Sequence, residues 1–318
     1  MKVLVTGGNG FVGRELVRKL LASECVLPGK PPLSQLTIVD MSGESLPDDP
    51  RISVVLGSIA DTAVLQEALA VEPDLVFHLA SVPGGAAERN YELGLSVNLT
   101  ATLALFEGLR IQAGRPVVVF TSTVAVYGRE LPPLINDHSL LQPELSYGAH
   151  KLAGEILLED YSRRGWLDGR FLRLPGIVAR PPEPSGLLSS YMSEVFWKLA
   201  AGQHFVCPVS AAATAWWMSV GCCADNLLHA ARLSAETASL RRGYTLPVLR
   251  LTMAEVVEGM AKKYGEDRRD LVEYQPNAEL EAVFGRYPPI DTRAAESVGF
   301  RHDGSLDVLI RNCMAWRD

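Results

Sequence analysis

The chain has 318 residues, of which 47% are hydrophobic and 21% are charged, and its formal net charge at pH 7 is -7. This composition excludes a disordered chain and indicates a globular protein that buries a large core. The acidic balance and the lack of basic runs argue against a nucleic-acid partner, because a phosphate backbone would find little long-range attraction.

The cysteines and the amino terminus bound the cellular setting. The five cysteines are odd in number and show no C-x-x-C spacing, so we expect neither a disulfide framework nor a metal site. Met1 leads straight into an apolar run, and no stretch approaches the roughly 20 apolar residues that span a bilayer. We therefore expect a cytoplasmic protein without a membrane partner.

The first half of the chain alternates short apolar runs with segments of helical periodicity. The apolar runs predict strands over 2–6, 36–40, 53–57, 75–79, 117–121 and 170–174. The periodic segments predict helices over 11–22, 62–70, 92–112 and 147–164. This alternation predicts the α/β class, with a doubly wound parallel sheet covered by helices on both faces.

The pattern changes after Pro175, where a stretch rich in proline and glycine interrupts the alternation. Beyond it we predict helices over 187–200, 220–233 and 252–264. The last of these begins at a Thr252 cap, with Glu255 three residues later. Two domains follow from this pattern. The first comprises residues 1–175, with the segment at about 220–250 packing back on it, and a smaller α/β lobe comprises 176–318.

A glycine cluster lies between the first predicted strand and the first predicted helix. Glycines at such a junction permit a tight turn and let the main chain approach a pyrophosphate. The start of the helix adds free N–H groups and the positive end of the helix dipole. The cluster predicts a Rossmann-type dinucleotide site. Its expected cofactor contacts are Gly7, Asn9, Gly10, Phe11, Val12 and Gly13.

Asp40 ends the second predicted strand. A carboxylate at this point can accept hydrogen bonds from both adenosine ribose hydroxyls and would repel a 2′-phosphate, which favours NAD over NADP. Asp40 lies further from Gly13 than the usual ~20 residues, and the loop over 23–34 accounts for the excess. The alternative is an acidic residue that faces solvent at the end of a strand.

Tyr147 and Lys151 open the predicted helix over 147–164, and their i, i+4 spacing places the phenol and the ammonium on one face. A free phenol titrates near ~10, which is too high for an efficient base at neutral pH. A nearby lysine cation and the cationic nicotinamide both favour the phenolate, so the pair predicts an acid/base site. Lys151 can also donate a hydrogen bond to the nicotinamide ribose. Alone, such a pair is more often a solvated helix face.

Hydroxyl side chains at 121–123 close the fifth predicted strand. The carboxyl ends of parallel strands face the crevice in which open α/β sheets bind ligands. One of these hydroxyls could therefore hold the reacting oxygen of a substrate. Combined with the glycine cluster, Tyr147 and Lys151, they make chance a poor explanation of the pattern.

These residues together resemble an extended short-chain dehydrogenase/reductase, the NAD-dependent epimerase/dehydratase family. The matching segments are Thr6-Gly7-x-x-Gly10-x-x-Gly13, Asp40, His78-Leu79-Ala80, Val97-Asn98, Thr121-Ser122-Thr123, Tyr127-Gly128, Tyr147-x-x-x-Lys151 and Arg173-x-Pro175. The resemblance implies that Tyr147 is the catalytic acid/base, that Lys151 is its partner and that Thr123, with Ser122 beside it, serves at the reacting centre. It also implies further contacts to NAD, at Ser58, Ile59, Leu79, Ala80, Ser81, Asn98, Thr121, Tyr147, Lys151 and Pro175.

Three departures from the nucleotide-sugar members of this family bear on the reaction. Those members usually carry an asparagine where this chain has Gly176, and they supply arginines to the diphosphate, whereas 199–231 contains no lysine or arginine. A diphosphate without cationic partners would bind poorly. In dehydratases an Asp-Glu pair occupies the positions of Val124 and Ala125, so dehydration is the easiest reaction to reject.

Further segments, including 155–165, 180–181, 201–203 and 208–210, resemble the D-erythronate dehydrogenase branch of the family. That resemblance implies NAD-dependent oxidation at C2 of a small sugar acid to a 2-oxo acid, with Tyr147 removing the hydroxyl proton. Arg180 is our candidate to bind the substrate carboxylate, and a solvent-facing or ion-paired arginine is the alternative. Ser81, Ser122 and Thr123 could donate to other substrate oxygens.

Two other functions stay open. A UDP-sugar 4-epimerase would use the same Tyr147, Lys151 and NAD, but would retain the cofactor and return the hydride to the opposite face. A non-catalytic sensor or scaffold would keep the glycine cluster and lose the tyrosine or the lysine, and this chain has both. Family members often dimerise through helices that match 92–112 and 147–164, so we also expect a homodimer.

Overall fold

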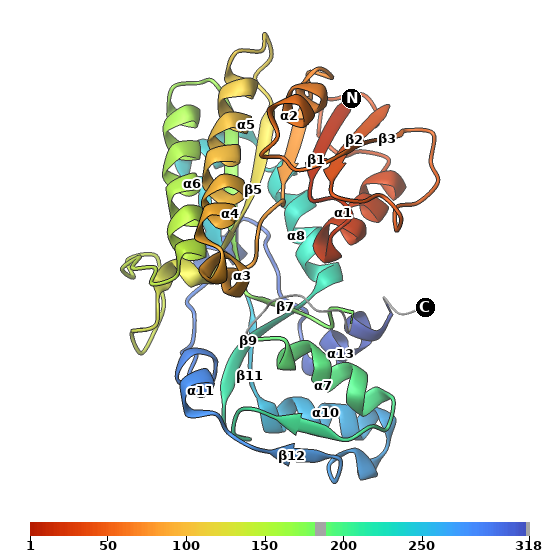
Figure 1. Ribbon diagram of the computed structural model, residues 1–318, viewed down its shortest axis with the longest axis vertical. Helices are drawn as coiled ribbons and strands as arrows, with labels where there is room; N and C mark the ends of the chain where they lie inside the picture. The colour runs from red at the N-terminus through yellow and green to blue at the C-terminus, as the bar shows by residue number, and fades with distance from the viewer. Residues whose placement is uncertain (182–188, 316–318) are drawn as a thin grey trace. The chain divides into compact units, whose positions relative to one another are not determined.

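The computed structural model describes residues 1–181 and 189–315 (Figure 1). The chain divides into two units, each formed by several segments. Unit 1 comprises Met1–Val126, Pro143–Arg173 and Ala224–Thr245. Unit 2 comprises Tyr127–Gln142, Leu174–Cys223 and Leu246–Asp318.

Unit 1 is built on a seven-stranded sheet with the strand order β3-β2-β1-β4-β5-β6-β10. The strands are β1 (Lys2–Thr6), β2 (Gln35–Asp40), β3 (Ile52–Leu56), β4 (Leu75–His78), β5 (Val117–Thr123), β6 (Asp168–Leu174) and β10 (Gly243–Thr245). β1 pairs in parallel with β2 on one side and with β4 on the other. This order reverses direction between β1 and β4, which is the switch point at which doubly wound sheets bind ligands. The predicted fold class is confirmed, and all six predicted strands are present within a few residues of their expected bounds.

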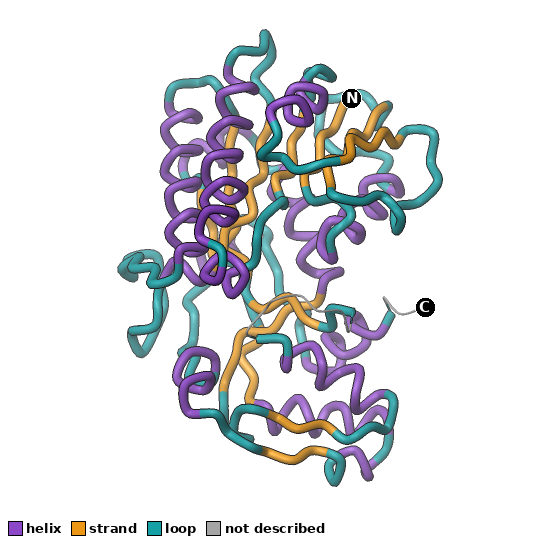
Figure 2. Tube along the Cα trace, in the orientation of Figure 1, coloured by secondary structure: helices purple, strands orange, loops and turns teal. Residues whose placement is uncertain are grey.

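Three helices share a core with one face of this sheet: α2 (Thr62–Leu69), α5 (Ala101–Arg110) and α6 (Ser146–Arg163). Figure 2 shows α5 and α6 running side by side along the strands. Their apolar residues pack with alternate residues of the strands, and Leu4, Leu105, Phe120 and Leu158 are fully buried there. The helices therefore face the sheet with the apolar stripe that their periodicity predicts.

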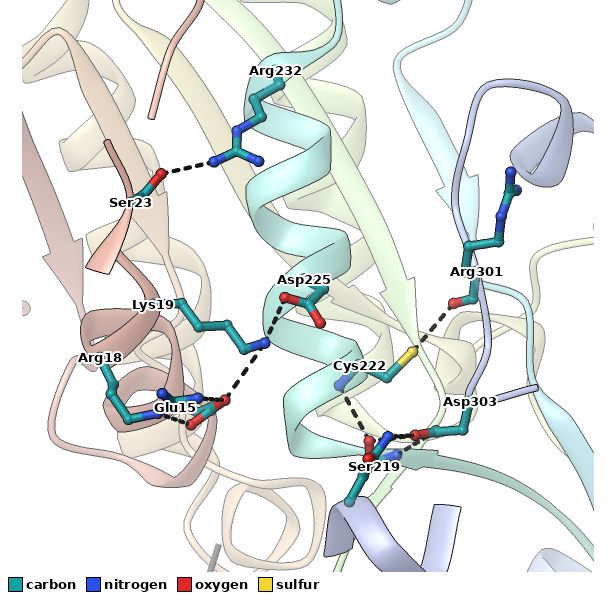
Figure 3. Close-up of polar contacts among 11 residues, drawn as sticks. Glu15, Arg18, Lys19, Ser23, Ser219, Cys222, Asp225, Arg232, Arg301 and Asp303 are labelled. Carbon is teal, nitrogen blue, oxygen red and sulfur yellow. Dashed lines mark hydrogen bonds and ion pairs between the residues drawn. The ribbon is translucent and has the colours of Figure 1, made fainter. Parts of the chain in front are cut away.

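A right-handed crossover from β1 to β2 places α1 (Phe11–Ala22) on the opposite face. Within unit 1, polar contacts join the end of α1 to α8 (Val220–Arg232). Lys19 pairs with Asp225 over 2.5 Å, and Arg232 donates to Ser23 over 2.9 Å (Figure 3). The short helix α9 (Ala235–Leu240) then leads to β10.

The predicted helix over 92–112 is interrupted in the structure. After α3 (Gly84–Arg89), the chain forms α4 (Tyr91–Leu95), a π-helical turn (Ser96–Thr100) and α5. The buried side chain of Asn98 lies in the π turn and bonds to the main chain of Val82 in both directions, over 2.7 and 3.0 Å. A π turn inserts an extra residue and often marks a functional site. Sequence periodicity alone does not reveal such an insertion.

Unit 2 has two small sheets packed with helices. One is β11-β9-β7, formed by Leu249–Thr252, Thr214–Ser219 and Gly176–Val178, and the other is β12-β8, formed by Val272–Tyr274 and Phe205–Cys207. The helices are α7 (Tyr191–Ala200), α10 (Met253–Tyr264), α11 (Ala278–Phe284), α12 (Arg293–Ser297) and α13 (Leu306–Met314). The predicted capping box at Thr252 and Glu255 is present at the start of α10. The predicted start of the helix over 187–200 lies outside the described residues.

A buried aspartate fixes the junction of β9 and α8 in unit 2. Asp303 accepts hydrogen bonds from the main-chain N–H and the hydroxyl of Ser219, over 2.9 and 2.5 Å (Figure 3). The same Ser219 hydroxyl accepts from the N–H of Cys222, as an N-cap does.

No helix within 1–181 and 189–315 is long and apolar enough to cross a membrane.

Candidate active site

In the glycine loop after β1, the main chain packs too closely against its neighbours to admit a side chain at Gly7 or Gly13. Gly7 has a φ of +74°, in the left-handed region, and a Cβ on it would come within 2.7 Å of the Ala80 nitrogen. A Cβ on Gly13 would come within 2.1 Å of the Gly7 oxygen. Gly10 is the N-cap residue of α1, and among the described residues no side chain caps that helix start. The loop thus fits a pyrophosphate bound by main-chain N–H groups.

Asp40 lies at the end of β2 beside this loop. Its Oδ2 accepts a hydrogen bond from the Asn9 N–H over 2.8 Å, and its Oδ1 accepts from the Met41 N–H over 2.7 Å. The Asn9 side chain donates to Ser42 over 2.7 Å. The carboxylate is therefore held against the glycine loop, and it does not extend into solvent as a mobile side chain.

The buried His78 connects the ends of β1 and β4. Its Nδ1 and Nε2 form hydrogen bonds with the hydroxyls of Thr6 and Thr102, over 2.7 and 2.8 Å. The Thr102 hydroxyl donates to the Asn98 oxygen, so it accepts from Nε2–H, and the neutral ring satisfies the whole network. Burial, and the charge of Lys151, lower the pKa of His78 to about 3. His78 is a structural residue that fixes the turn leading to Leu79, Ala80 and Ser81.

Other predicted cofactor residues have side chains that serve the fold. Thr121 donates to the main-chain oxygen of His78 over 3.0 Å, and Ser58 accepts from the Ala60 N–H over 3.2 Å. Ile59 is buried in the core shared with α2. Like the Asn98 amide, the Thr121 hydroxyl shapes the carboxyl end of the sheet. Because the Ile59 side chain is buried in the core, any contact of Ile59 with the cofactor would be made by its main chain.

Tyr147 and Lys151 lie in the first two turns of α6, as predicted. The Lys151 side chain is 1% exposed, and its Nζ lies 5.8 Å from the centroid of the Tyr147 ring and 4.8 Å from that of Phe120. Burial lowers the pKa of Lys151 to about 7. The ammonium is thus desolvated beside the phenol, where it acts on the phenol through a low-dielectric medium.

Ser122 and Thr123 end β5, but they differ in their contacts. The Ser122 hydroxyl donates to Glu155, a buried residue of α6, and Ser122 itself is 2% exposed. The Thr123 hydroxyl accepts a hydrogen bond from the Ala125 N–H over 3.1 Å, and among the described residues no side chain or main-chain oxygen takes its own proton. Glu155 was missed from the sequence, although its position one turn after Lys151 was a possible signal.

Pro175 and Arg180 belong to unit 2. Pro175 is buried and lies in the chain between the end of β6 and the start of β7. Arg180 is half-buried, and its main-chain oxygen accepts a hydrogen bond from the indole N–H of Trp197 on α7. Ala179 before it has a φ of +60°, an uncommon conformation for a residue with a Cβ. Such backbone strain persists only where the surrounding structure enforces it.

Residues 3–233 match the model of the NAD-dependent epimerase/dehydratase family. The chain belongs to this family. The match covers the glycine loop, Asp40, Tyr147 and Lys151, so the predicted family is confirmed.

The chain is similar to two curated proteins over almost its whole length. It is 40% identical to the D-erythronate dehydrogenase of Cupriavidus necator, covering 99% of this chain and 98% of that protein. It is 30% identical to the D-erythronate dehydrogenase of Haemophilus influenzae, covering 98% of each. Among solved structures, a nucleoside-diphosphate-sugar epimerase from Agrobacterium tumefaciens matches with a TM-score of 0.92 and 30% identity, covering 99% of this chain and 94% of that one.

Proposed function

We propose that this protein is an NAD-dependent dehydrogenase that oxidises the C2 hydroxyl of a small, D-erythronate-like sugar acid to a 2-oxo acid. One observation carries the proposal: the buried Lys151 ammonium lies 5.8 Å from the ring centroid of Tyr147 on α6. The two relatives that are 40% and 30% identical to this chain are named D-erythronate dehydrogenase, which supports the substrate class.

The shape of the glycine loop and the position of Asp40 support NAD as the cofactor. We assign the pyrophosphate to the loop and the start of α1, and the adenosine ribose to Asp40, which disfavours NADP. The full set of proposed cofactor residues is Gly7, Asn9, Gly10, Phe11, Val12, Gly13, Asp40, Ser58, Ile59, Leu79, Ala80, Ser81, Asn98, Thr121, Tyr147, Lys151 and Pro175. NAD, when bound, supplies the hydride acceptor for the oxidation.

The side chains of this chain handle the proton. Tyr147, as the phenolate, takes the proton of the substrate hydroxyl, and a protonated Lys151 beside it favours that phenolate. Thr123 donates its free proton to the reacting oxygen and so orients it. We assign no substrate contact to Ser122, because its proton is donated to Glu155.

A sugar acid needs a partner for its carboxylate. We assign this role to Arg180, whose guanidinium can bind both carboxylate oxygens, and we assign Ser81 to another substrate oxygen. The lack of lysine and arginine over 199–231 supports a substrate without a diphosphate. Replacing Arg180 by methionine is expected to raise KM for the sugar acid more than KM for NAD⁺.

The proposal is tested by following NADH formation in the near ultraviolet with NAD⁺ and a panel of four- to six-carbon sugar acids. Turnover of a sugar acid that Tyr147→Phe abolishes supports it. UDP-sugars assayed for epimerisation under the same conditions are the comparison. Activity on UDP-sugars alone would contradict the dehydrogenase proposal.

A nucleotide-sugar 4-epimerase is the second candidate. The structural match to the nucleoside-diphosphate-sugar epimerase, at 30% identity, is the observation in its favour. An epimerase that uses Tyr147 and Lys151 returns the hydride to its substrate, so it would purify with bound cofactor and release no net NADH. The NADH assay therefore separates the two candidates.

We further propose that the protein is a homodimer through α4, α5 and α6. Large apolar side chains are exposed on these neighbouring helices of unit 1, among them Tyr91, Leu93, Leu103 and Ile156. Exposed apolar side chains gathered on one surface often mark a protein interface. The family resemblance points to the same helices.

A further inference from the structure

Three elements of unit 1 meet at one buried carboxylate. Glu155 on α6 is 2% exposed, and the Nε and Nη2 atoms of Arg173 on β6 donate to its two oxygens over 3.0 and 2.8 Å. The Oγ of Ser122 on β5 donates to Glu155 Oε1. Buried charged groups with bidentate geometry are costly to separate, because one partner would be left unpaired. The carboxylate therefore ties α6, β5 and β6 together.

This carboxylate lies close to the proposed reacting groups along both β5 and α6. Ser122 precedes Thr123 in β5, and Glu155 follows Lys151 by about one turn of α6. The helix packs closely on the strand, because a Cβ at Gly154 would come within 2.8 Å of the Phe120 ring. A contact that prevents α6 from sliding along β5 also fixes Tyr147 and Lys151 relative to Thr123.

We propose that Glu155 is a positioning residue for the oxidation: held by Arg173, it binds the Ser122 hydroxyl and so fixes the end of β5 against α6. This inference rests on the proposed roles of Thr123, Tyr147 and Lys151. Ser122 then acts through Glu155 and does not touch the substrate. Displacing reacting groups by about 1 Å can cost on the order of 100-fold in rate, so a modest shift of β5 is enough to matter.

The test is a double-mutant cycle with Ser122→Ala, Glu155→Gln and the double variant, measured as kcat at saturating NAD⁺ and substrate. Each single variant is expected to lose about tenfold in kcat, because Ser122→Ala removes the charge-assisted contact between the two residues and Glu155→Gln weakens it. The double variant is expected to lose no more than about tenfold, because Ser122 acts only through Glu155. The dissociation constant of NADH, from fluorescence titration, is expected to stay within about twofold. An additive loss of about 100-fold would show that Ser122 acts independently and would overturn the proposal. An unchanged kcat in either single variant would overturn it too.

Ser162→Ala is the matched control. Ser162 is a buried serine on the same helix, and its hydroxyl donates to the Leu158 oxygen over 2.6 Å and accepts from the Gly169 N–H over 3.0 Å. Its loss is expected to lower Tm without lowering kcat, which separates positioning from general stability.

If Glu155→Gln does not fold, Ser122→Thr decides the question. Threonine keeps the hydroxyl at this position and is expected to restore kcat relative to Ser122→Ala, whereas a threonine variant as slow as the alanine variant would overturn the proposal. The cycle can be run on whichever substrate the wild-type protein turns over. A wild type that epimerises UDP-sugars and oxidises no sugar acid contradicts the proposed function, and the cycle still tests the role of Glu155.

Discussion

At the scale of single residues, the site depends on where charge is buried. Lys151 is a cation enclosed by unit 1, and burial lowers its pKa to about 7. Close to neutral pH the charged and the neutral form are therefore both populated. Its position on α6, 5.8 Å from the Tyr147 ring centroid, makes the phenol the group that responds to this charge.

Replacing Tyr147 by phenylalanine removes the proton acceptor and keeps the ring. We expect kcat to fall by about 10³-fold or more, while the affinity for NADH changes little, because the glycine loop and Asp40 are untouched. Steady-state kinetics and NADH fluorescence titration measure the two quantities. Wild-type turnover in this variant would remove Tyr147 from the mechanism.

Replacing Asp40 by alanine removes the carboxylate at the end of β2. The ratio of kcat/KM for NAD⁺ to that for NADP⁺ is expected to fall by about tenfold or more, because the repulsion of a 2′-phosphate is lost. Asn9 also loses its hydrogen-bond acceptor, so a melting curve should accompany the kinetics. An unaltered cofactor preference would mean that another residue distinguishes the ribose hydroxyl of NAD from the 2′-phosphate of NADP.

At the scale of elements, the site is formed where main chains approach closely. The glycine loop touches the start of α1 at Gly13, and α6 packs on β5 at Gly154. Side chains at these points would force the elements apart. The positions of Asp40, Tyr147 and Thr123 therefore depend on small residues between them as well as on their own contacts.

Gly13→Ala tests the close approach in the cofactor loop. The added Cβ would lie 2.1 Å from the Gly7 oxygen, so the loop must shift, and NADH binding is expected to weaken by about tenfold or more. Gly114→Ala is the matched control, because a Cβ there meets no atom within 4 Å among the described residues. Equal NADH affinity in the two variants would contradict the assignment of the pyrophosphate to this loop.

At the scale of the whole molecule, the buried His78 couples stability to pH. Its pKa in the folded protein is about 3, below the ordinary 6.5, so protonation favours the unfolded chain. The stabilising effect is present above pH 6.5 and is lost as the pH falls toward 3. Between pH 6.5 and pH 5 this amounts to about 2 kcal/mol in the free energy of unfolding.

The measurement compares urea unfolding of the wild type and of His78→Asn at these two pH values. Because other groups titrate in the same range, only the difference between the proteins reports on His78. The variant is expected to be less stable at pH 6.5 and to lose less stability on acidification. A loss as large as that of the wild type would assign the pH dependence to other groups.

The proposed dimer is tested with Ile156→Glu, which places a charge on the exposed face of α6, where Ile156 is 60% exposed. Light scattering is expected to give twice the chain mass for the wild type and the chain mass for the variant, because a buried unpaired carboxylate is costly. Leu240→Glu, on the exposed side of α9, is the control and is expected to stay dimeric. A monomeric wild type would contradict the proposal.

The sequence by itself determined the family, the parallel sheet, the glycine loop and the Tyr147–Lys151 pair. These features are local: strand and helix periodicity, and an i, i+4 spacing, act over a few residues and can be read without the fold. Asp40 belongs with them, because the end of an apolar run also marks the end of β2.

Only the tertiary structure decided which of the adjacent hydroxyls is free. Ser122 and Glu155 are 33 residues apart, and Glu155 and Arg173 are 18 apart, so no local pattern predicts that they meet. The π turn at Asn98 likewise depends on a partner, Val82, that lies 16 residues away. The partners in these hydrogen bonds meet only when distant elements pack together, and for that reason the bonds escape a reading of the sequence.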